Sequence, residues 1–396
     1  MTGIAEGLAR TTNVGVLCNQ PTYAARGTVA PRYELRRGVE IWRAAGTTFD
    51  RSRLFLRLVN LVTISLSLFG AAWSRVTSGD VVVVTTNPPT LPFLTLLAAR
   101  LRGARCALLV HDVYPDVLVA SGMFTRNSVL VRAIGALQRA LYRHLDMIIV
   151  IGRDMESLIT TRLPDSRRSI VRIPNWADAD AVHPQRKAGN ALLTKLGLAD
   201  KFIVEYSGNM GRTHGLEALV AAAERFRSDE SVHFLFIGDG AMKRWLERTV
   251  VERALSNVTV LPYQPREMLT VLLNACDIAI ISFASGMAGV SVPSRMYNVL
   301  AAGKPIIAVS DEASELAQLV REEIVGWVVA PGDAIAIAGS ITEAQRDKNR
   351  LVAMGQRARH AAETKYSYEA AIASYRSVLS ELLHHLDRGG DPRPPA

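Results

Sequence analysis

Residues 232–240 have the sequence VHFLFIGDG, an apolar run that ends in glycine, aspartate and glycine. Such a run fits a strand that is buried on both faces of a sheet and followed by a tight turn. Further short runs of this kind alternate with longer helical stretches, which predicts parallel sheets covered by helices on both faces. These runs lie at residues 13–19, 80–87, 105–113, 147–152, 169–175, 202–209, 257–263, 278–283, 305–310 and 325–330.

The polar stretch 183–199 divides these runs into two series. We therefore expect an α/β protein with two doubly wound, Rossmann-like domains that face each other across a cleft. The first domain is expected over residues 1–185 and the second over residues 186–365. An amphipathic helix over 366–387 follows, and the Pro-rich tail 388–396 is expected to be disordered.

The composition of the 396-residue chain is that of an ordinary globular protein, with 49% hydrophobic and 21% charged residues. It excludes the disordered, collagen-like and disulfide-rich classes. Cys18, Cys106 and Cys276 are far apart and odd in number, which indicates buried thiols in a reducing compartment. The first residues lack the charged leader and apolar run of a signal peptide, so we expect a cytoplasmic protein.

The net charge of +9 is concentrated in the first half of the chain. Residues 1–187 hold 24 Lys and Arg against 13 Asp and Glu, whereas the remainder holds 22 against 24. A basic half can face nucleic acid, an anionic membrane surface or a phosphorylated substrate. The sequence has neither basic patches interleaved with aromatic residues nor a known nucleic-acid-binding module, so we expect no nucleic-acid partner.

One apolar segment, residues 58–73, is uncharged over 16 residues, slightly short of the roughly 18 to 20 needed to span a bilayer. Polar residues at three- and four-residue spacing form a narrow stripe along it, and arginines flank it. The stripe consists of Asn60, Thr63, Ser67 and Ser74, and the arginines are Arg51, Arg53, Arg57 and Arg75. This pattern fits either a helix lying in the membrane interface, with its arginines at the lipid headgroups, or a helix buried against a sheet.

Ligands of open parallel sheets bind beyond the carboxyl ends of the strands. Here those ends carry polar residues and glycines, and two facing domains would place them along a common cleft. They are His111, Asp112, Gly152, Arg153, the tripeptide 174–176, Ser207, Gly208, Asn209, Gly238, Asp239, Gly240, Tyr263 and Gln264.

The segment 285–305, SGMAGVSVPSRMYNVLAAGKP, is the most informative in the chain. Gly286 and Gly289 allow the loop backbone to approach a ligand closely, and Ser294 can cap the helix that follows. Free N–H groups, the helix dipole and the charge of Arg295 then favour a bound phosphate. A plain loop followed by a capped helix explains the same pattern.

A second segment, 204–217 (VEYSGNMGRTHGLE), has the same organisation of strand, glycine-rich turn and helix start. Arg212 and His214 stand where a second phosphate contact is expected. Two such loops in one domain indicate a nucleotide diphosphate as the ligand.

The C-terminal half of the chain resembles glycosyltransferase family 4 of the GT-B fold, in particular its bacterial surface-polysaccharide branch. The resemblance rests on segments that occur in the same order: YSGNMGR followed by GLE, IGDGAMKRWLE, LPYQPREMLTVLLNACDIAI and VPSRMYNVLAAGKPIIA. The N-terminal half resembles the acceptor domain of the same enzymes through VTTNPPTLPFLTLLAARLRGA, LLVHDVYPD and IPNWAD. In that fold the terminal helix, here 366–387, crosses back to the first domain.

The resemblance implies transfer of a sugar from a UDP- or GDP-linked donor, with retention at the anomeric carbon, no essential metal and no cofactor. Gly208, Asn209 and Arg212 would line the donor phosphates, Arg295 would contact the diphosphate, and the loop 288–292 would enclose the phosphate and sugar. Further donor-binding positions are implied at His214, Gly238, Gly289, Val290, Ser291, Ser294 and Asn298, with Tyr263 and Gln264 at the nucleobase.

The same resemblance implies a catalytic role for His111 and Asp112, which fall near the reacting sugar and the acceptor hydroxyl. A histidine at a strand end is as often a satisfied polar group as a catalytic one, so both interpretations of His111 stay open.

The paired glutamates that the family carries in an E-x7-E pattern are absent, and Val290 and Asn298 stand in their places. The amide oxygen of Asn298 can accept hydrogen bonds from ribose hydroxyls, but as a neutral and weaker acceptor. Asp178 and Asp180 form the D-x-D pattern that binds a metal in another class of glycosyltransferases. They follow a Pro-Asn-Trp segment in which aspartate is common in turns, so we expect no metal site.

Residues 1–12 correspond to the end of the family's first helix, so the first strand and its glycine-rich turn are missing. That strand is central in the usual doubly wound order, and its loss predicts unpaired strand edges in the N-terminal sheet. The gap indicates either a start further upstream or a truncated relative.

These observations predict a peripheral membrane glycosyltransferase at the inner face of the plasma membrane. Its acceptor would be a polyprenyl-diphosphate-linked saccharide in exopolysaccharide or O-antigen synthesis. A nucleotide-sugar epimerase of the same fold is a second hypothesis, which would leave the basic half without a lipid to contact. A third hypothesis is a truncated, inactive relative that serves as a binding or scaffold protein, motivated by the missing strand and glutamates.

Overall fold

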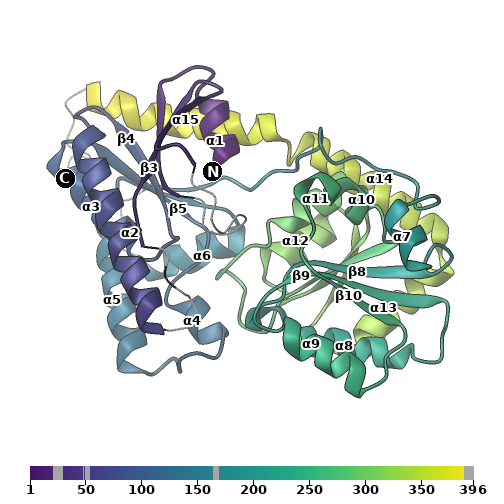
Figure 1. Ribbon diagram of the computed structural model, residues 1–396. Coiled ribbons are helices and arrows are strands. Elements are labelled where there is room, and N and C mark those ends of the chain that lie inside the picture. The colour runs from purple at the N-terminus through teal and green to yellow at the C-terminus, as the bar shows by residue number, and fades with distance from the viewer. Residues whose placement is uncertain (21–29, 48, 50–53, 164–168, 388–396) are drawn as a thin grey trace.

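The computed structural model describes residues 1–20, 30–47, 49, 54–163 and 169–387. The chain forms two α/β domains built on parallel strands with helices packed against them (Figure 1). This arrangement confirms the predicted fold class of two facing Rossmann-like domains. The predicted tail, residues 388–396, lies outside the described residues.

The C-terminal domain contains one uninterrupted sheet of six parallel strands in the order β10-β9-β8-β11-β12-β13. The strands are β8 (Phe202–Asn209), β9 (Val232–Asp239), β10 (Val258–Leu261), β11 (Ile278–Ser282), β12 (Ile306–Val309) and β13 (Gly326–Val329). The α-helices are α7 (Ala191–Leu196), α8 (Leu216–Arg225), α9 (Lys243–Glu252), α10 (Leu269–Leu273), α11 (Arg295–Ala301), α12 (Glu315–Glu322), α13 (Ala334–Arg346) and α14 (Lys348–Thr364). Two short 3-10 turns cover Arg212–His214 and Arg266–Met268.

Strand β9 shows why this sheet is buried on both faces. Phe234 and Phe236 belong to one apolar core, whereas Leu235 and Ile237 belong to another. Side chains that alternate along a strand point to opposite faces, so a nearly continuous apolar run supplies both layers of helices with a packing surface.

The N-terminal domain contains two separate sheets instead of the single sheet predicted. Strands β4 (Val81–Thr85), β5 (Arg105–Val110), β6 (Met147–Val150) and β7 (Ser169–Arg172) form a parallel sheet in that order. Strand β1 (Val14–Asn19) instead pairs in parallel with β3 (Val39–Ala44). Among the described strands, β1 pairs only with β3 and β4 only with β5, which agrees with the predicted unpaired strand edges.

The hairpin of β2 (Tyr33–Arg36) and β3 was not predicted from the sequence. Its two strands are antiparallel and meet at Arg37 and Gly38, which both adopt positive φ. A two-residue loop with two positive φ angles is the turn that joins twisted hairpin strands, and glycine at its second position is the signal that was overlooked.

The helices of the N-terminal domain pack on both of its sheets. They are α1 (Thr2–Leu8), α2 (Leu54–Arg75), α3 (Leu91–Leu101), α4 (Asp116–Ala120), α5 (Val129–His144) and α6 (Arg153–Arg162). Of these, α3 and α6 contact the four-stranded sheet, and α1 and α2 contact the three-stranded one. Among the helices in the described ranges, none combines the length and apolar character that crossing a bilayer requires.

Helix α2 covers the predicted apolar segment, and part of its polar stripe faces the protein. The amide of Asn60 accepts from the Phe49 N–H and donates to the Phe49 carbonyl, both at 3.0 Å. Thr63 lies 2.7 Å from the hydroxyl of Thr47. Helix α2 also packs on α3 and on β1 and β3.

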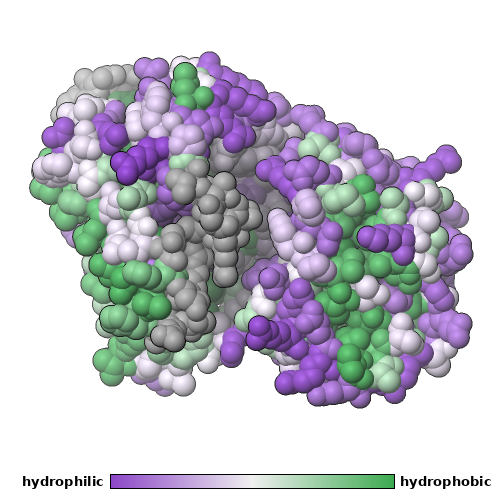
Figure 2. Space-filling model, viewed as in Figure 1, coloured by the Kyte–Doolittle hydropathy of each residue, from purple (hydrophilic) through white to green (hydrophobic). Residues whose placement is uncertain are grey.

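The outward face of α2 is apolar and exposed, so the helix is only partly buried, and its placement in a membrane interface stays a prediction. Its exposed residues are Phe55, Val62, Leu66 and Trp73, and neighbouring helices add Leu97, Leu101, Val129, Leu130 and Leu137. We call these nine residues the apolar face. Figure 2 shows apolar residues gathered over this side of the N-terminal domain. The predicted arginines Arg51 and Arg53 lie outside the described residues.

Helix α15 (Tyr368–Asp387) follows α14 and packs on the N-terminal domain (Figure 1). It contacts α1 and β4, and Tyr375 and Leu382 are buried in the core of that domain. The Tyr368 hydroxyl donates to the Gly3 carbonyl at 2.7 Å. The end of the chain therefore forms part of the domain in which the chain begins.

Candidate functional site

The carboxyl ends of β8 and β9 lie close enough together that they require glycine. The two strands pair to their last residues, with Gly208 opposite Gly238 and Asn209 opposite Asp239. A Cβ atom on Gly238, whose φ is +149°, would stand 1.9 Å from the Gly208 carbonyl oxygen. The glycines that the sequence analysis selected are thus needed for the close approach of the two turns.

Arg295, the first residue of α11, lies over the end of β8. Its Nη1 donates to the Ser207 carbonyl at 3.1 Å, and its guanidinium carbon is 4.4 Å from the centre of the Tyr206 ring. A Cβ on Gly208 would come within 2.6 Å of the same Nη1. The structure therefore brings together Arg295 and Gly208, which are 87 positions apart in the sequence.

Ser294 occupies the N-cap position of α11 but its side chain makes no capping hydrogen bond. The prediction of a capping serine was wrong, for a conformational reason. Its φ of −58° and ψ of −26° are helical, whereas a capping side chain folds back from an extended backbone.

His214 lies in the turn after β8, with its ring 5.4 Å from the ring of Phe283. Burial and the positive charge of Arg295 lower the pKa of His214 to about 3. The imidazole is therefore neutral near pH 7 and able to donate one hydrogen bond beside the Arg295 cation. Asn209 and Arg212 are exposed on the same turn.

The loop of residues 284–292, which we call the donor loop, differs from its prediction. Its N–H groups were expected to be free for a phosphate. Instead, Gly286, Met287 and Ala288 donate to one Asp311 carboxylate oxygen at 2.8, 3.1 and 3.3 Å. Asp311 follows β12 at the same sheet edge, and a carboxylate at a strand end was the available signal for it.

The middle of the donor loop contacts the N-terminal domain. The Val113 N–H donates to the Val290 carbonyl at 2.8 Å, and Asp112 forms a β-bridge with Ser291. The Val290 side chain is buried with Phe283 and Met287 in a small core that also receives Val117, Ala120 and Leu158 from the N-terminal domain. The backbone of Val290 thus contacts the N-terminal domain, while its side chain is buried away from solvent.

His111 and Asp112 follow β5 directly. Both backbone N–H groups donate to the Thr86 hydroxyl, at 3.2 and 3.3 Å, and Thr86 is a residue the sequence analysis missed. Burial and the positively charged N-terminal amine lower the pKa of His111, although Asp112 acts in the opposite direction. The imidazole is therefore neutral, and the bridge of Asp112 to Ser291 links this pair with the donor loop.

The remaining predicted residues lie at the edge of this cluster. Asn298 accepts a hydrogen bond from the Asp178 N–H at 3.2 Å through its amide oxygen, so that oxygen already has a partner. Tyr263 is exposed, and the Gln264 side chain donates to the Pro262 carbonyl at 2.9 Å. The described contacts do not join Tyr263 or Gln264 to Arg295.

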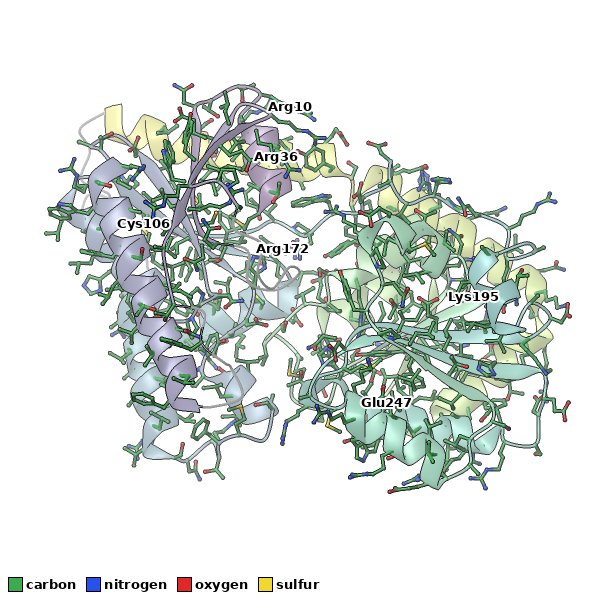
Figure 3. The ribbon with its side chains drawn as sticks, viewed as in Figure 1. Arg10, Arg36, Cys106, Arg172, Lys195 and Glu247 are labelled. Atoms are coloured by element: carbon green, nitrogen blue, oxygen red, sulfur yellow. The ribbon has the colours of Figure 1, made fainter. Side chains whose placement is uncertain are left out.

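The D-x-D pattern is engaged in an ion pair at its first position. The Asp178 carboxylate lies 3.2 Å from the Arg266 guanidinium. Within the described part of the chain, no three His, Cys, Asp or Glu side chains converge as they would around a metal ion. Figure 3 shows Arg172, at the end of β7, between the two domains, and its guanidinium lies 3.8 Å from Glu156.

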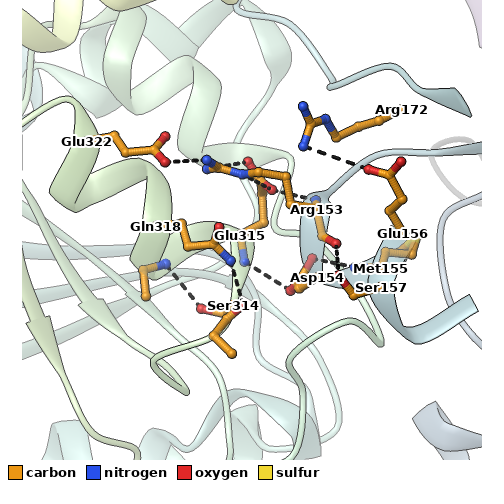
Figure 4. Close-up of polar contacts among 12 residues, drawn as sticks. Arg153, Asp154, Met155, Glu156, Ser157, Arg172, Ser314, Glu315, Gln318 and Glu322 are labelled. Carbon is orange, nitrogen blue, oxygen red and sulfur yellow. Dashed lines mark hydrogen bonds and ion pairs between the residues drawn. The ribbon is translucent and has the colours of Figure 1, made fainter. Parts of the chain in front are cut away.

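A polar network joins the start of α6 to the start of α12 across the domain boundary (Figure 4). The Arg153 guanidinium donates to both carboxylate oxygens of Glu315, at 3.0 and 3.1 Å, and it also pairs with Glu322. The Arg153 N–H donates to Glu315 at 2.7 Å. Glu315 is buried, so the boundary is fixed by a two-point charged contact.

Asp154 adds contacts to the same network. One of its carboxylate oxygens accepts from the N–H groups of Gly289 and Glu315, at 2.8 and 3.0 Å. Burial raises the pKa of Asp154 above its usual value, although these N–H groups oppose the shift. Arg153 was predicted at a strand end, whereas Asp154 was not among the predicted site residues.

Comparison with known proteins covers both domains. Residues 1–176 match the family model described as glycosyl transferase 4-like domain, and residues 192–361 match glycosyl transferases group 1. The probable glycosyltransferase WbjE of Pseudomonas aeruginosa is 32% identical over 311 residues, which cover 78% of this chain and 76% of WbjE. The putative colanic acid biosynthesis glycosyl transferase WcaI of Escherichia coli strain K12 is 28% identical over 320 residues, which cover 79% of this chain and 76% of WcaI.

Solved structures share the fold. Sucrose-phosphate synthase from Thermosynechococcus elongatus has a TM-score of 0.74 at 20% identity, covering 96% of this chain and 92% of that one. Anabaena HepE in complex with UDP-glucose has a TM-score of 0.69 at 15% identity, covering 87% of each chain. These matches extend over both domains and agree with the resemblance in the sequence. The chain therefore belongs to glycosyltransferase family 4 and has the GT-B fold.

Proposed function

We propose that this glycosyltransferase moves a sugar from a UDP- or GDP-linked donor to a lipid-linked saccharide during synthesis of a bacterial surface polysaccharide. The anomeric configuration is retained, and no metal or cofactor takes part. The observation that carries the proposal is the position of Arg295 over the end of β8, beside His214. The names of WbjE and WcaI support the reaction class, and that of WcaI supports the polysaccharide setting.

The donor site is proposed at the carboxyl ends of β8, β9 and β11. A diphosphate carries charge that requires directed donors, and the Arg295 guanidinium offers several in a fixed plane. The neutral His214 adds a hydrogen-bond donor, and because it is uncharged it does not repel the Arg295 cation. Arg212 and Asn209 are exposed at the mouth of the turn and are proposed to reach the phosphates from the solvent side.

The chemical step forms a bond between an acceptor hydroxyl oxygen and the anomeric carbon of the sugar. The bond from that carbon to the diphosphate oxygen breaks on the same face, which keeps the configuration, and the hydroxyl proton passes to the departing diphosphate. Negative charge grows on the departing diphosphate, where Arg295 stabilises it. His111 is proposed to hold the acceptor hydroxyl through its neutral imidazole, and Asp112 to orient the sugar.

The acceptor side is proposed to meet a membrane at its inner surface. The apolar face on α2, α3 and α5 is exposed, and Arg75 and Arg102 flank it at the end of α2, where the Arg102 guanidinium lies 5.8 Å from the Trp73 ring. Apolar side chains bordered by arginines suit the boundary between lipid chains and anionic headgroups. An acceptor carried on a lipid would then arrive beside the N-terminal domain.

The donor half of the proposal is tested by calorimetry with UDP and GDP on the full-length chain. We expect micromolar binding of one nucleotide and a loss of about 100-fold in affinity for Arg295→Ala, because a charged hydrogen-bond partner of the phosphate is removed. Arg248→Ala, an exposed arginine on α9, serves as the control and should bind normally. Absence of binding to both nucleotides would contradict the proposal.

The membrane half is tested by sedimentation with lipid vesicles. We expect binding to vesicles that contain phosphatidylglycerol and weaker binding to phosphatidylcholine alone. Leu66→Glu should reduce binding by about tenfold or more, since it places a charge where a leucine would be buried. Val251→Glu, a still more exposed apolar position on α9, should have no effect. Equal binding of both variants would contradict the assignment of this face.

A further inference from the structure

The donor loop is held by carboxylates from both domains. Asp311, in the same domain as the loop, accepts from three consecutive N–H groups at 286–288. The next N–H group, that of Gly289, donates to Asp154 on α6 of the other domain at 2.8 Å. At Gly289 the N–H groups of the loop therefore change acceptor, from a carboxylate of their own domain to a carboxylate of the N-terminal domain.

Contacts at this point leave little space for movement. A Cβ atom on Gly289, whose φ is +73°, would stand 2.7 Å from the Asp154 carbonyl oxygen and 3.1 Å from Leu158. On the other side, a Cβ on Gly152 would meet the Val292 side chain at 2.7 Å. Two glycines, one from each domain, thus allow α6 and the donor loop to touch.

The carboxylate of Asp154 is occupied entirely by backbone donors. Its Oδ2 accepts from Gly289 and from Glu315 at the start of α12, and its Oδ1 accepts from Met155 at 2.8 Å. Among the described contacts, no cation pairs with this carboxylate. Its charge is instead stabilised by N–H groups from both domains. The carboxylate can accept from both sets of N–H groups only while the two domains keep this arrangement.

We propose that Asp154 is a positioning residue for the donor, because it fixes the donor loop at Gly289 to the N-terminal domain. The inference rests on the proposed function in one respect, namely that the nucleotide-sugar binds beside this loop. Domain arrangement and donor affinity are then coupled through a single carboxylate. Because Asp154 would act through the loop, its removal should raise KM for the nucleotide-sugar more than it lowers kcat.

The first test compares nucleotide affinity in three variants. Asp154→Ala should weaken binding of the preferred nucleotide by about tenfold, since a buried N–H of the donor loop loses a charged acceptor. Asp154→Asn keeps one acceptor oxygen and should recover part of the loss. Asp146→Ala is the control, because Asp146 also accepts a backbone N–H, from Cys106 at 2.8 Å, but within one domain. It should lower Tm without changing nucleotide affinity by more than about twofold.

The second test measures amide hydrogen exchange in the nucleotide-free chain. Exchange at Gly289 and its neighbours should be faster in Asp154→Ala than in the wild type, and unchanged in α8. This result does not depend on a bound nucleotide. Failure of the wild type to bind UDP or GDP would therefore overturn the proposed function while exchange still decides the role of Asp154. Unchanged exchange at Gly289, or equal affinity losses in Asp154→Ala and Asp146→Ala, would overturn the positioning role.

Discussion

Both domains are built on parallel strands, but they arrange these strands in different sheets. The C-terminal domain pairs six parallel strands without interruption, whereas the N-terminal domain divides its strands between a four-stranded and a three-stranded sheet. The proposed site draws on the six-stranded sheet and, through His111 and Asp112 after β5, on the four-stranded one. None of the predicted site residues lies on β1, β2 or β3. The comparison teaches that the predicted site residues follow strands of the six-stranded and four-stranded sheets, at their carboxyl ends.

The largest effect is expected from breaking the six-stranded sheet at its functional end. Gly238→Ala places a Cβ 1.9 Å from the Gly208 carbonyl, so we expect a loss of about 3 to 5 kcal/mol in unfolding free energy. Gly332→Ala is the control, because Gly332 has φ +84° with nothing within 4 Å of its Cβ and should cost only about 1 to 2 kcal/mol. Urea denaturation measures both, and equal losses would show that the close approach at Gly238 relaxes without cost.

A pH-dependent effect is expected from the central strand of the same sheet. Glu205 on β8 is buried, and burial raises its pKa to about 8, although Lys304 opposes the shift. The folded state thus holds a proton that the unfolded state loses above about pH 4.5. Stability from this group is fully present below pH 4.5 and is lost as the pH rises to 8, at up to about 1.4 kcal/mol per pH unit.

Glu205→Gln should remove this dependence, because the amide has no proton to lose. At pH 9 the variant should be more stable than the wild type by a few kcal/mol, whereas near pH 4 the two should be similar. Denaturation at several pH values measures the difference. A wild type and variant with parallel pH profiles would show that Glu205 is ionised in the folded protein.

The stability of the N-terminal domain should depend on hydrogen bonds between side chains and backbone groups. Asn60 on α2 is buried and makes both of its amide hydrogen bonds to Phe49. Asn60→Ala should therefore cost about 2 kcal/mol, because it leaves two backbone groups of Phe49 without a partner. Ser74→Ala, an exposed serine at the end of the same helix, should change stability by less than about 0.5 kcal/mol. Thermal unfolding distinguishes them, and similar Tm values would contradict the inward placement of the polar stripe.

The smallest effects compare one open glycine in each domain. Gly70 on α2 and Gly339 on α13 have nothing within 4 Å of an added Cβ. Alanine at either position should stabilise the protein by about 0.5 to 1 kcal/mol, since the helical backbone loses less entropy on folding. Chemical denaturation of both variants sharpens the comparison. A gain at Gly339 with a loss at Gly70 would indicate that α2 carries a constraint absent from α13.

The strands of the C-terminal sheet could be predicted because each is an apolar run bounded by turn residues, as in residues 232–240. The hairpin at residues 33–44 was missed, because its strands are short and carry no comparable apolar run, and β2 is mostly exposed. Periodicity located α2 but not its orientation. That orientation depends on partners for Asn60 and Thr63 in the preceding loop, and these are not visible in the pattern.

In the candidate site, too, the residues with a local sequence signal could be predicted, whereas those defined by contacts between distant residues could not. Arg295 and His214 could be selected because each follows a glycine-rich segment. The roles of Asp311 and Asp154 depend on N–H groups more than twenty residues away in the first case and 135 residues away in the second. Ser294 failed as a predicted cap because residue type does not determine backbone angles.

Helix α15 sets the order in which the protein can be completed during synthesis. The six strands of the C-terminal sheet have all been made by residue 329, so that sheet can form while the chain is still being elongated. The N-terminal domain waits for Tyr375 and Leu382 to fill its core, although most of its residues leave the ribosome first. The domain that is translated first is therefore the last to be finished, and until then its unfilled core is exposed to proteases and chaperones.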